Sequence, residues 1–361
     1  MKNFNIIKFI CFKKDNLLRD SFSKIQRRMS KAKEVSFDPR MTEESKKFIG
    51  KFSKLMDRKL YKQLNLDEIR NLINTSTFIL NEKLKVENVI EKEYFVQNLD
   101  DNYDIPVTAY IPNNVASKYS PITIYFHGGG WTICSRKTHH HAIKILAQKT
   151  NSIWLSVEYR LAPEYKFPTC LDDCTSVVKW VVENKSKYFN SPLNSKIGIA
   201  GDSAGGTMAA SIGHELKKLV NFQILIYPCV QFNMAYASYK EFQSQQYLLT
   251  PALLKYFTLN LINDLEEINL PRLAPMLNEN FDNLPNTLII AAELDPLVDD
   301  SKEYHKKLQE TGNKSELHVI KGVQHGFFNL PGILPNAFHE TSEYIIKFLK
   351  KFFLDEKISK L

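Results

Sequence analysis

The chain has 361 residues, of which 43% are hydrophobic and 24% charged, and its formal net charge is +8. These values exclude a disordered or collagen-like chain, and a chain of this length buries enough surface to fold without disulfides or a metal. Residues 1–35 carry ten basic and three acidic residues, so the rest of the chain is nearly neutral and no nucleic-acid partner is predicted.

The predicted elements begin with two amphipathic helices, over 42–62 and 66–82, where apolar residues recur at helical spacing. From about residue 92, short apolar runs alternate with longer helical stretches. The predicted strands are Tyr94–Gln97, Pro106–Ile111, Ile122–Phe126, Ile153–Val157, Ile197–Ala200, Gln223–Tyr227, Thr287–Ala291 and Leu317–Ile320. The predicted helices between and after them are 138–149, 170–185, 204–219, 251–263, 301–311 and 337–353. This alternation predicts an α/β fold with a mostly parallel sheet of about eight strands and helices on both faces.

Residues 231–275 interrupt the alternation with a stretch rich in Tyr, Phe and Leu. One interpretation is a further core helix. The other is a helical cap, built together with residues 36–90, over the carboxyl ends of the strands, where ligands bind in parallel sheets. We therefore expect an α/β domain over 91–356 with a cap insertion at about 231–275.

The two ends of the sequence carry separate signals. Residues 1–35 are basic and moderately apolar, which favours a solvated, flexible extension over a mitochondrial presequence. No run approaches the roughly 18 apolar residues of a membrane-spanning helix. Within the tail 357–361, Ser359, Lys360 and Leu361 form the tripeptide that a peroxisomal import receptor reads, so we expect a peroxisomal or else a cytoplasmic protein.

A nucleophile is predicted at Ser203, in the sequence Gly201-Asp202-Ser203-Ala204-Gly205. This matches G-x-S-x-G, and it follows a predicted strand and opens a helix, as that motif requires. Small residues on either side of the serine let strand and helix approach closely. The free amides at the start of the helix face a developing negative charge.

An oxyanion-binding loop is predicted at His127-Gly128-Gly129-Gly130-Trp131, directly after the strand 122–126. Three glycines let the backbone approach a ligand, and such a loop supplies amide donors to a tetrahedral oxyanion together with the amide of Ala204.

The base and the acid should follow the serine in the order acid, then histidine. Of the histidines after Ser203, only His325 lies in a loop directly after a predicted strand, because His214, His305 and His339 fall in helices and His318 in a strand. Asp295 follows the strand 287–291 and is the predicted acid, with Glu293 as its main rival.

Two groups of potential metal ligands are interpreted as structural. His139, His140 and His141 are consecutive on a predicted helix, where neighbouring side chains diverge by about 100°, so they do not converge on one ion. The five cysteines are an odd number with no C-x-x-C pair, which indicates a reducing compartment and no structural zinc. No cofactor and no metal are predicted.

Four blocks of the sequence resemble the hormone-sensitive lipase and arylacetamide deacetylase group of α/β-hydrolases. They are HGGGW at 127–131, the block from Glu158 to Glu164 with Phe167-Pro168 beyond it, GDSAGG at 201–206, and Asp295-Pro296-Leu297 paired with His325-Gly326-Phe327. The resemblance implies an α/β-hydrolase fold with a helical cap. It also implies oxyanion donors at Gly129, Gly130 and Ala204, a turn shaped by Gly128, and a structural role for the block that contains Glu158 and Glu164.

The expected activity is that of a serine carboxylic ester hydrolase, which attacks short to medium acyl esters or lipid-derived esters through an acyl-enzyme. Amidase or deacetylase, lipase and thioesterase activities of the same fold remain alternatives. A ligand receptor without turnover is a further alternative, but family members of that kind have typically lost the histidine that this chain retains as His325.

Overall fold

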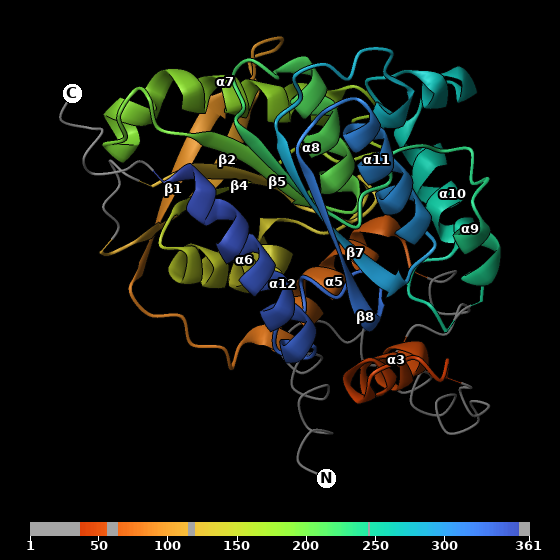
Figure 1. Cartoon of the computed structure of the whole chain (residues 1–361). Helices are drawn as coiled ribbons and strands as arrows, with labels where there is room; N and C mark the ends of the chain where they lie inside the picture. The colour runs from red at the N-terminus through yellow and green to blue at the C-terminus, as the bar shows by residue number, and fades with distance from the viewer. Residues whose placement is uncertain (1–36, 56–63, 115–119, 245, 354–361) are drawn as a thin grey trace.

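The computed structural model describes residues 37–55, 64–114, 120–244 and 246–353. Eight strands in these ranges form one sheet, in the order β1-β2-β4-β3-β5-β6-β7-β8. Figure 1 shows the strands of this sheet lying between helices. They are β1 (Val89–Gln97), β2 (Asp104–Pro112), β3 (Ile122–Phe126), β4 (Ile153–Val157), β5 (Ile197–Asp202), β6 (Phe222–Ile226), β7 (Asn286–Leu294) and β8 (Ser315–Gln324). The β1–β2 and β2–β4 pairs are antiparallel and the others are parallel, so the predicted fold class is confirmed.

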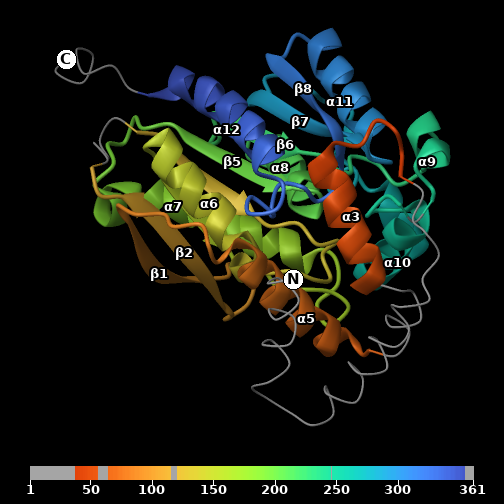
Figure 2. The same ribbon diagram turned by 90° about the horizontal axis from the view of Figure 1, so that it is seen from below.

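Helices cover both faces of the sheet, as Figure 2 shows from below. One apolar core lies between the sheet and α7 (Thr169–Phe189), α8 (Ala204–Glu215) and α11 (Val298–Glu310). The other lies between the sheet and α6 (Arg136–Thr150) and α12 (Pro335–Leu349), which is followed by η3 (Lys350–Phe352). Because both faces are covered, every residue of the central strands β3, β4, β5 and β6 is buried, which explains their continuous apolar sequences.

The N-terminal helices lie on the outside of this framework. Helix α3 spans Glu43–Leu55 and contacts β8, whereas α5 spans Leu66–Asn81 and packs on α6. The end of the predicted helix 42–62 falls outside the described residues. Arg70 of α5 donates hydrogen bonds of 2.8 Å to the carbonyl oxygens of Thr132 and Ala162 and pairs with Glu164. These bonds attach α5 to the loop that follows the three glycines, through Thr132, and to the segment after β4, through Ala162 and Glu164.

The interrupting stretch 231–275 contains α9 (Ala237–Glu241), α10 (Pro251–Leu261) and η1 (Leu265–Asn269), and η2 (Pro275–Leu277) begins at its end. We call residues 231–275 the insertion segment. The residues before α3 contact it, because Asp38 accepts a hydrogen bond of 2.8 Å from the Tyr247 hydroxyl and Arg40 pairs with Glu241 at 2.8 Å.

Several predicted boundaries were wrong. Strands β7 and β8 continue to Leu294 and Gln324, so Asp295 and His325 follow their strands directly. Helix α8 ends at Glu215 rather than at residue 219, and α10 ends at Leu261 rather than at 263. No helix within the described ranges is long and apolar enough to cross a membrane.

Candidate active site

Ser203 occupies a strained turn between β5 and α8. Its φ is +54° and its ψ is −121°, a conformation that residues with a side chain rarely adopt. The turn is held by a hydrogen bond of 2.8 Å from the Ser203 amide to the Ile226 carbonyl. A methyl group on Gly201 would lie 2.3 Å from the backbone of Gly205, and one on Gly205 would lie 1.9 Å from the Phe126 carbonyl oxygen. The close approach that the motif predicts therefore requires glycine at both positions.

The structure brings Ser203, His325 and Asp295 into one chain of hydrogen bonds. The His325 Nε2 atom lies 2.8 Å from the Ser203 hydroxyl, and its Nδ1 atom lies 2.6 Å from the Asp295 carboxylate. Asp295 is fully buried, and its second oxygen accepts a hydrogen bond of 2.9 Å from the Leu297 amide. His325 is 7% exposed. The three side chains follow the carboxyl ends of β5, β7 and β8, where this geometry allows a proton to pass from the hydroxyl to the imidazole.

The rival residues have other partners. Glu293 accepts hydrogen bonds from the Gly322 amide at 2.7 Å and from Lys321 at 3.0 Å. His214 contacts the Tyr304 hydroxyl at 2.9 Å, and the His318 ring stacks on Tyr344. His305 contacts the Ser315 hydroxyl, and His339 contacts Lys149.

The glycine loop has amides with different roles. Gly128 donates a hydrogen bond of 2.7 Å to the Asp202 carboxylate, so its amide is already used. Gly129 and Gly130 have φ values of +117° and +57°, a backbone conformation that favours glycine. Among the described residues, the amides of Gly129, Gly130 and Ala204 have no hydrogen-bond partner. The Gly128 contact with Asp202 joins this loop to the Ser203 turn, and amides without a partner are the kind of donor that an oxyanion requires.

Asp202 anchors a buried cluster that the sequence analysis did not identify. Besides Gly128, its carboxylate contacts the hydroxyls of Tyr125 at 2.5 Å and Tyr227 at 3.3 Å and the His139 Nε2 atom at 3.1 Å. Burial opposes ionisation, but His139 and the hydrogen bonds from Tyr125 and Gly128 outweigh it and lower the pKa of Asp202 to about 2. The only signal in the sequence is the acidic residue inside G-x-S-x-G.

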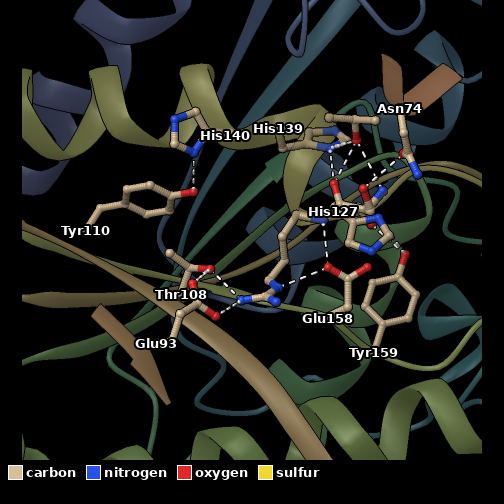
Figure 3. Close-up of polar contacts among 12 residues, drawn as sticks. Asn74, Glu93, Thr108, Tyr110, His127, His139, His140, Glu158 and Tyr159 are labelled. Carbon is tan, nitrogen blue, oxygen red and sulfur yellow. Dashed lines mark hydrogen bonds and ion pairs between the residues drawn. The ribbon is translucent and has the colours of Figure 1, made fainter. Parts of the chain in front are cut away.

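A second set of polar contacts supports the start of the glycine loop (Figure 3). The Tyr159 hydroxyl donates a hydrogen bond of 2.7 Å to the His127 carbonyl, and the two rings stack with centroids 4.3 Å apart. Burial lowers the pKa of His127 to about 4, so its imidazole is neutral near pH 7. Glu158 pairs with Arg136 at 2.9 Å, and Arg136 also pairs with Glu93 at 2.6 Å.

The three consecutive histidines make different contacts, although the His140 and His141 rings also lie edge to face with centroids 5.0 Å apart. His139 faces Asp202, His140 contacts the Tyr110 hydroxyl at 3.1 Å, and the His141 ring packs against Phe78. Within the described ranges no group of three or more His, Cys, Asp or Glu side chains is arranged to hold a metal ion.

Comparison with known proteins identifies the class of fold and then the family. A doubly covered sheet with a serine on the turn after its fifth strand is the arrangement of an α/β-hydrolase. Residues 123–329 match the sequence model of the family described as alpha/beta hydrolase fold, and the chain belongs to that family. It is an enzyme of the carboxylesterase type within the hormone-sensitive lipase-like group that the sequence motifs indicated.

Two curated relatives are esterases. The chain is 28% identical to an arylesterase of Saccharolobus solfataricus over 75% of this chain and 87% of that protein. It is 33% identical to the carboxylesterase NlhH of Mycobacterium tuberculosis over 66% of this chain and 76% of that protein. Among solved structures, an esterase of Pyrobaculum calidifontis superposes with a TM-score of 0.77 and 28% identity, over 86% of this chain and 98% of that one.

Proposed function

We propose that the chain hydrolyses carboxylic esters with Ser203 as nucleophile, His325 as general base and acid, and Asp295 as the group that orients the imidazole. The observation that carries this proposal is the continuous set of contacts from the Ser203 hydroxyl to His325, at 2.8 Å, and on to Asp295, at 2.6 Å. The comparison with known esterases supports the same class of reaction.

The proposed reaction has two halves. The Ser203 oxygen attacks the ester carbonyl carbon while His325 takes the hydroxyl proton, and Asp295 stabilises the imidazolium that forms. The amides of Gly129, Gly130 and Ala204 donate to the oxyanion. His325 then gives its proton to the departing alkoxide, and the alcohol leaves. In the second half, His325 takes a proton from water as the water oxygen attacks the acyl carbon, and it returns that proton to the Ser203 oxygen as the bond to the acyl group breaks and the carboxylic acid leaves.

The proposed substrates are esters with short to medium acyl chains or lipid-derived esters. The insertion segment acts as a cap in this proposal, because its side chains lie over the loops that carry Gly130 and Gly326. Amides, thioesters and long-chain lipids are the competing substrate classes, and each differs from the proposed one in the leaving group or in the length of the acyl chain.

The test is hydrolysis of p-nitrophenyl esters from acetate to palmitate by the wild type and by Ser203→Ala. We expect activity on the shorter esters that falls to background in the variant, together with covalent labelling of the wild type alone by a fluorophosphonate probe. Folded wild-type protein that neither hydrolyses any ester nor takes the label would contradict the proposal and favour ligand binding without turnover.

The peroxisomal location stays a prediction, since Ser359, Lys360 and Leu361 lie outside the described residues. Its test is the location of a tagged chain with and without Leu361. Import that does not depend on Leu361 would exclude the tripeptide as the address.

A further inference from the structure

We propose that two side chains of the insertion segment divide the substrate site, with Phe257 limiting the size of the acyl group and Leu248 contacting the leaving alcohol. This inference rests on the proposed function, because it assigns the two parts of an ester to the two sides of Ser203.

Phe257 lies directly on the glycine loop. A methyl group on Gly130 would lie 2.2 Å from Cγ of the Phe257 ring and 2.4 Å from its Cδ2, so the ring is in close contact with the Gly130 backbone. Phe257 is buried, with 7% of its surface exposed, but it does not belong to any of the three apolar core clusters of the described residues. Its neighbours Leu254 and Leu261 on the same helix do pack into the main core. Helix α10 therefore directs one large apolar side chain at the proposed oxyanion amides.

Leu248 lies on the other side, against the loop that carries the histidine. A methyl group on Gly326 would lie 3.0 Å from Cδ2 of Leu248, and Gly326 directly follows His325. The preceding residue, Tyr247, is fixed by its hydrogen bond of 2.8 Å to Asp38. Leu248 is thus held beside the base by a contact with the segment before α3.

The reaction chemistry assigns the two sides. His325 must protonate the departing oxygen, so the alcohol portion of the ester lies next to His325 and therefore next to Leu248. The carbonyl oxygen points at the amides of Gly129, Gly130 and Ala204. In this assignment the acyl chain, the third substituent of that carbon, points away from His325 and passes the Phe257 ring, which packs over Gly130 beside the oxyanion donors. A bulky ring at that place shortens the acyl chain that fits.

The experiment measures kcat/KM for two ester series. One varies the acyl chain of p-nitrophenyl esters from acetate to decanoate, and the other varies the alcohol of acetate esters from ethyl to naphthyl. The variants are Phe257→Ala, Phe257→Leu and Leu248→Ala. Leu259→Ala is the matched control, because Leu259 lies on the same helix and is 49% exposed on its outer side.

We expect Phe257→Ala to raise the ratio of decanoate to acetate activity about tenfold or more, since pocket size typically discriminates by that much per changed group. The alcohol series should stay within about twofold of the wild type. Leu248→Ala should change the alcohol series and leave the acyl series unaltered, and Leu259→Ala should change neither. Phe257→Leu should give an intermediate acyl profile, and thermal unfolding of each variant establishes that it is folded.

The inference is overturned if folded Phe257→Ala and Phe257→Leu keep the wild-type acyl profile, or if they change the alcohol series instead. The proposed function fails in a different way, through ester hydrolysis that persists in Ser203→Ala. If ester hydrolysis depends on Ser203 but the Phe257 and Leu248 variants keep the wild-type selectivity, only the assignment of the acyl and alcohol sides is rejected.

Discussion

The Asp202 carboxylate accepts a hydrogen bond of 2.7 Å from the main-chain amide of Gly128. This contact joins the turn that carries Ser203 to the loop that carries Gly129 and Gly130, although Gly128 and Asp202 are far apart in the sequence. A methyl group on Gly128 would lie 2.4 Å from the Asp202 carboxylate, so the two segments are in close contact. The spacing between the nucleophile and two of the proposed oxyanion donors therefore depends on one buried side chain.

We expect Asp202→Ala to lower kcat about 10- to 100-fold with little change in KM, because it removes the oxygen that accepts the Gly128 amide hydrogen bond. Losing a single oxyanion donor outright costs about 100- to 1000-fold, and a displaced loop should cost less than that. Steady-state kinetics on p-nitrophenyl acetate measures the effect. Tyr125→Phe is the matched control, because it removes one hydrogen bond to the same carboxylate and leaves the Gly128 contact in place. An equal decrease of kcat in both variants, or a change in KM alone, would contradict a role of Asp202 in positioning the loop.

Asp295→Asn should lower kcat by about 10⁴-fold, as loss of the carboxylate does in other serine hydrolases by favouring the wrong imidazole tautomer. Glu293→Gln is the control, since Glu293 contacts Lys321 and Gly322 rather than His325. It should keep kcat within about twofold of the wild type. A larger loss in Glu293→Gln than in Asp295→Asn would assign the acid to the rival residue.

The buried strands and the order of the motifs could be predicted because their signals are local. Strand β3 reads as a continuous apolar run, and the turn at Ser203 is encoded by neighbouring small residues. The extension of β8 to Gln324 could not be predicted, since Lys321 and Gly322 resemble a loop, and the strand is held there by pairing Gln324 with Leu294 of β7. Local sequence does not contain that pairing.

The Asp202 cluster was missed for a different reason. Its members come from the ends of β3, β5 and β6 and from α6, and only the parallel register of the sheet brings Tyr125, Tyr227 and His139 to one carboxylate. The helical spacing of the three histidines did not reveal that His139 points at the residue before the nucleophile. Arg70 was missed likewise, because its acceptors are main-chain carbonyls that no side-chain pattern reveals.

Arg70→Ala should destabilise the protein by about 2 kcal/mol, because it removes two hydrogen bonds from a charged group to the carbonyls of Thr132 and Ala162. Arg70→Lys should recover only part of this loss, since an ammonium group does not reproduce the planar fork of the guanidinium. Glu164→Gln should cost less than about 1 kcal/mol, because the Glu164 side chain is 49% exposed and surface ion pairs contribute little. Urea unfolding measures all three, and a larger effect for Glu164→Gln than for Arg70→Ala would assign the stability to the ion pair instead.

His214 should make the stability of the protein depend on pH between about 6.5 and 4. Burial is the main cause that lowers the pKa of His214 from 6.5 to about 4 in the folded protein, where its ring packs edge-on against Phe281 and contacts the Tyr304 hydroxyl. The unfolded chain therefore binds a proton at a higher pH than the folded chain does. The contribution of His214 to the free energy of unfolding is therefore fully present above about pH 6.5, and it is lost as the pH falls toward 4.

His214→Gln removes this titration and retains a side chain that can bond to Tyr304. Between pH 7 and pH 4 the wild type should lose about 3 kcal/mol more unfolding free energy than the variant, since the pKa of His214 falls from 6.5 to about 4 on folding and one pKa unit corresponds to about 1.4 kcal/mol. The buried His127 and His141 also have lowered pKa values, but they are present in both proteins and cancel in the difference. The measurement is urea unfolding at several pH values. If the unfolding free energies of the wild type and of His214→Gln change in parallel with pH, His214 is protonated in the folded protein as readily as in the unfolded chain. If the free energy of the variant falls more steeply as the pH is lowered, the effect has the opposite sign.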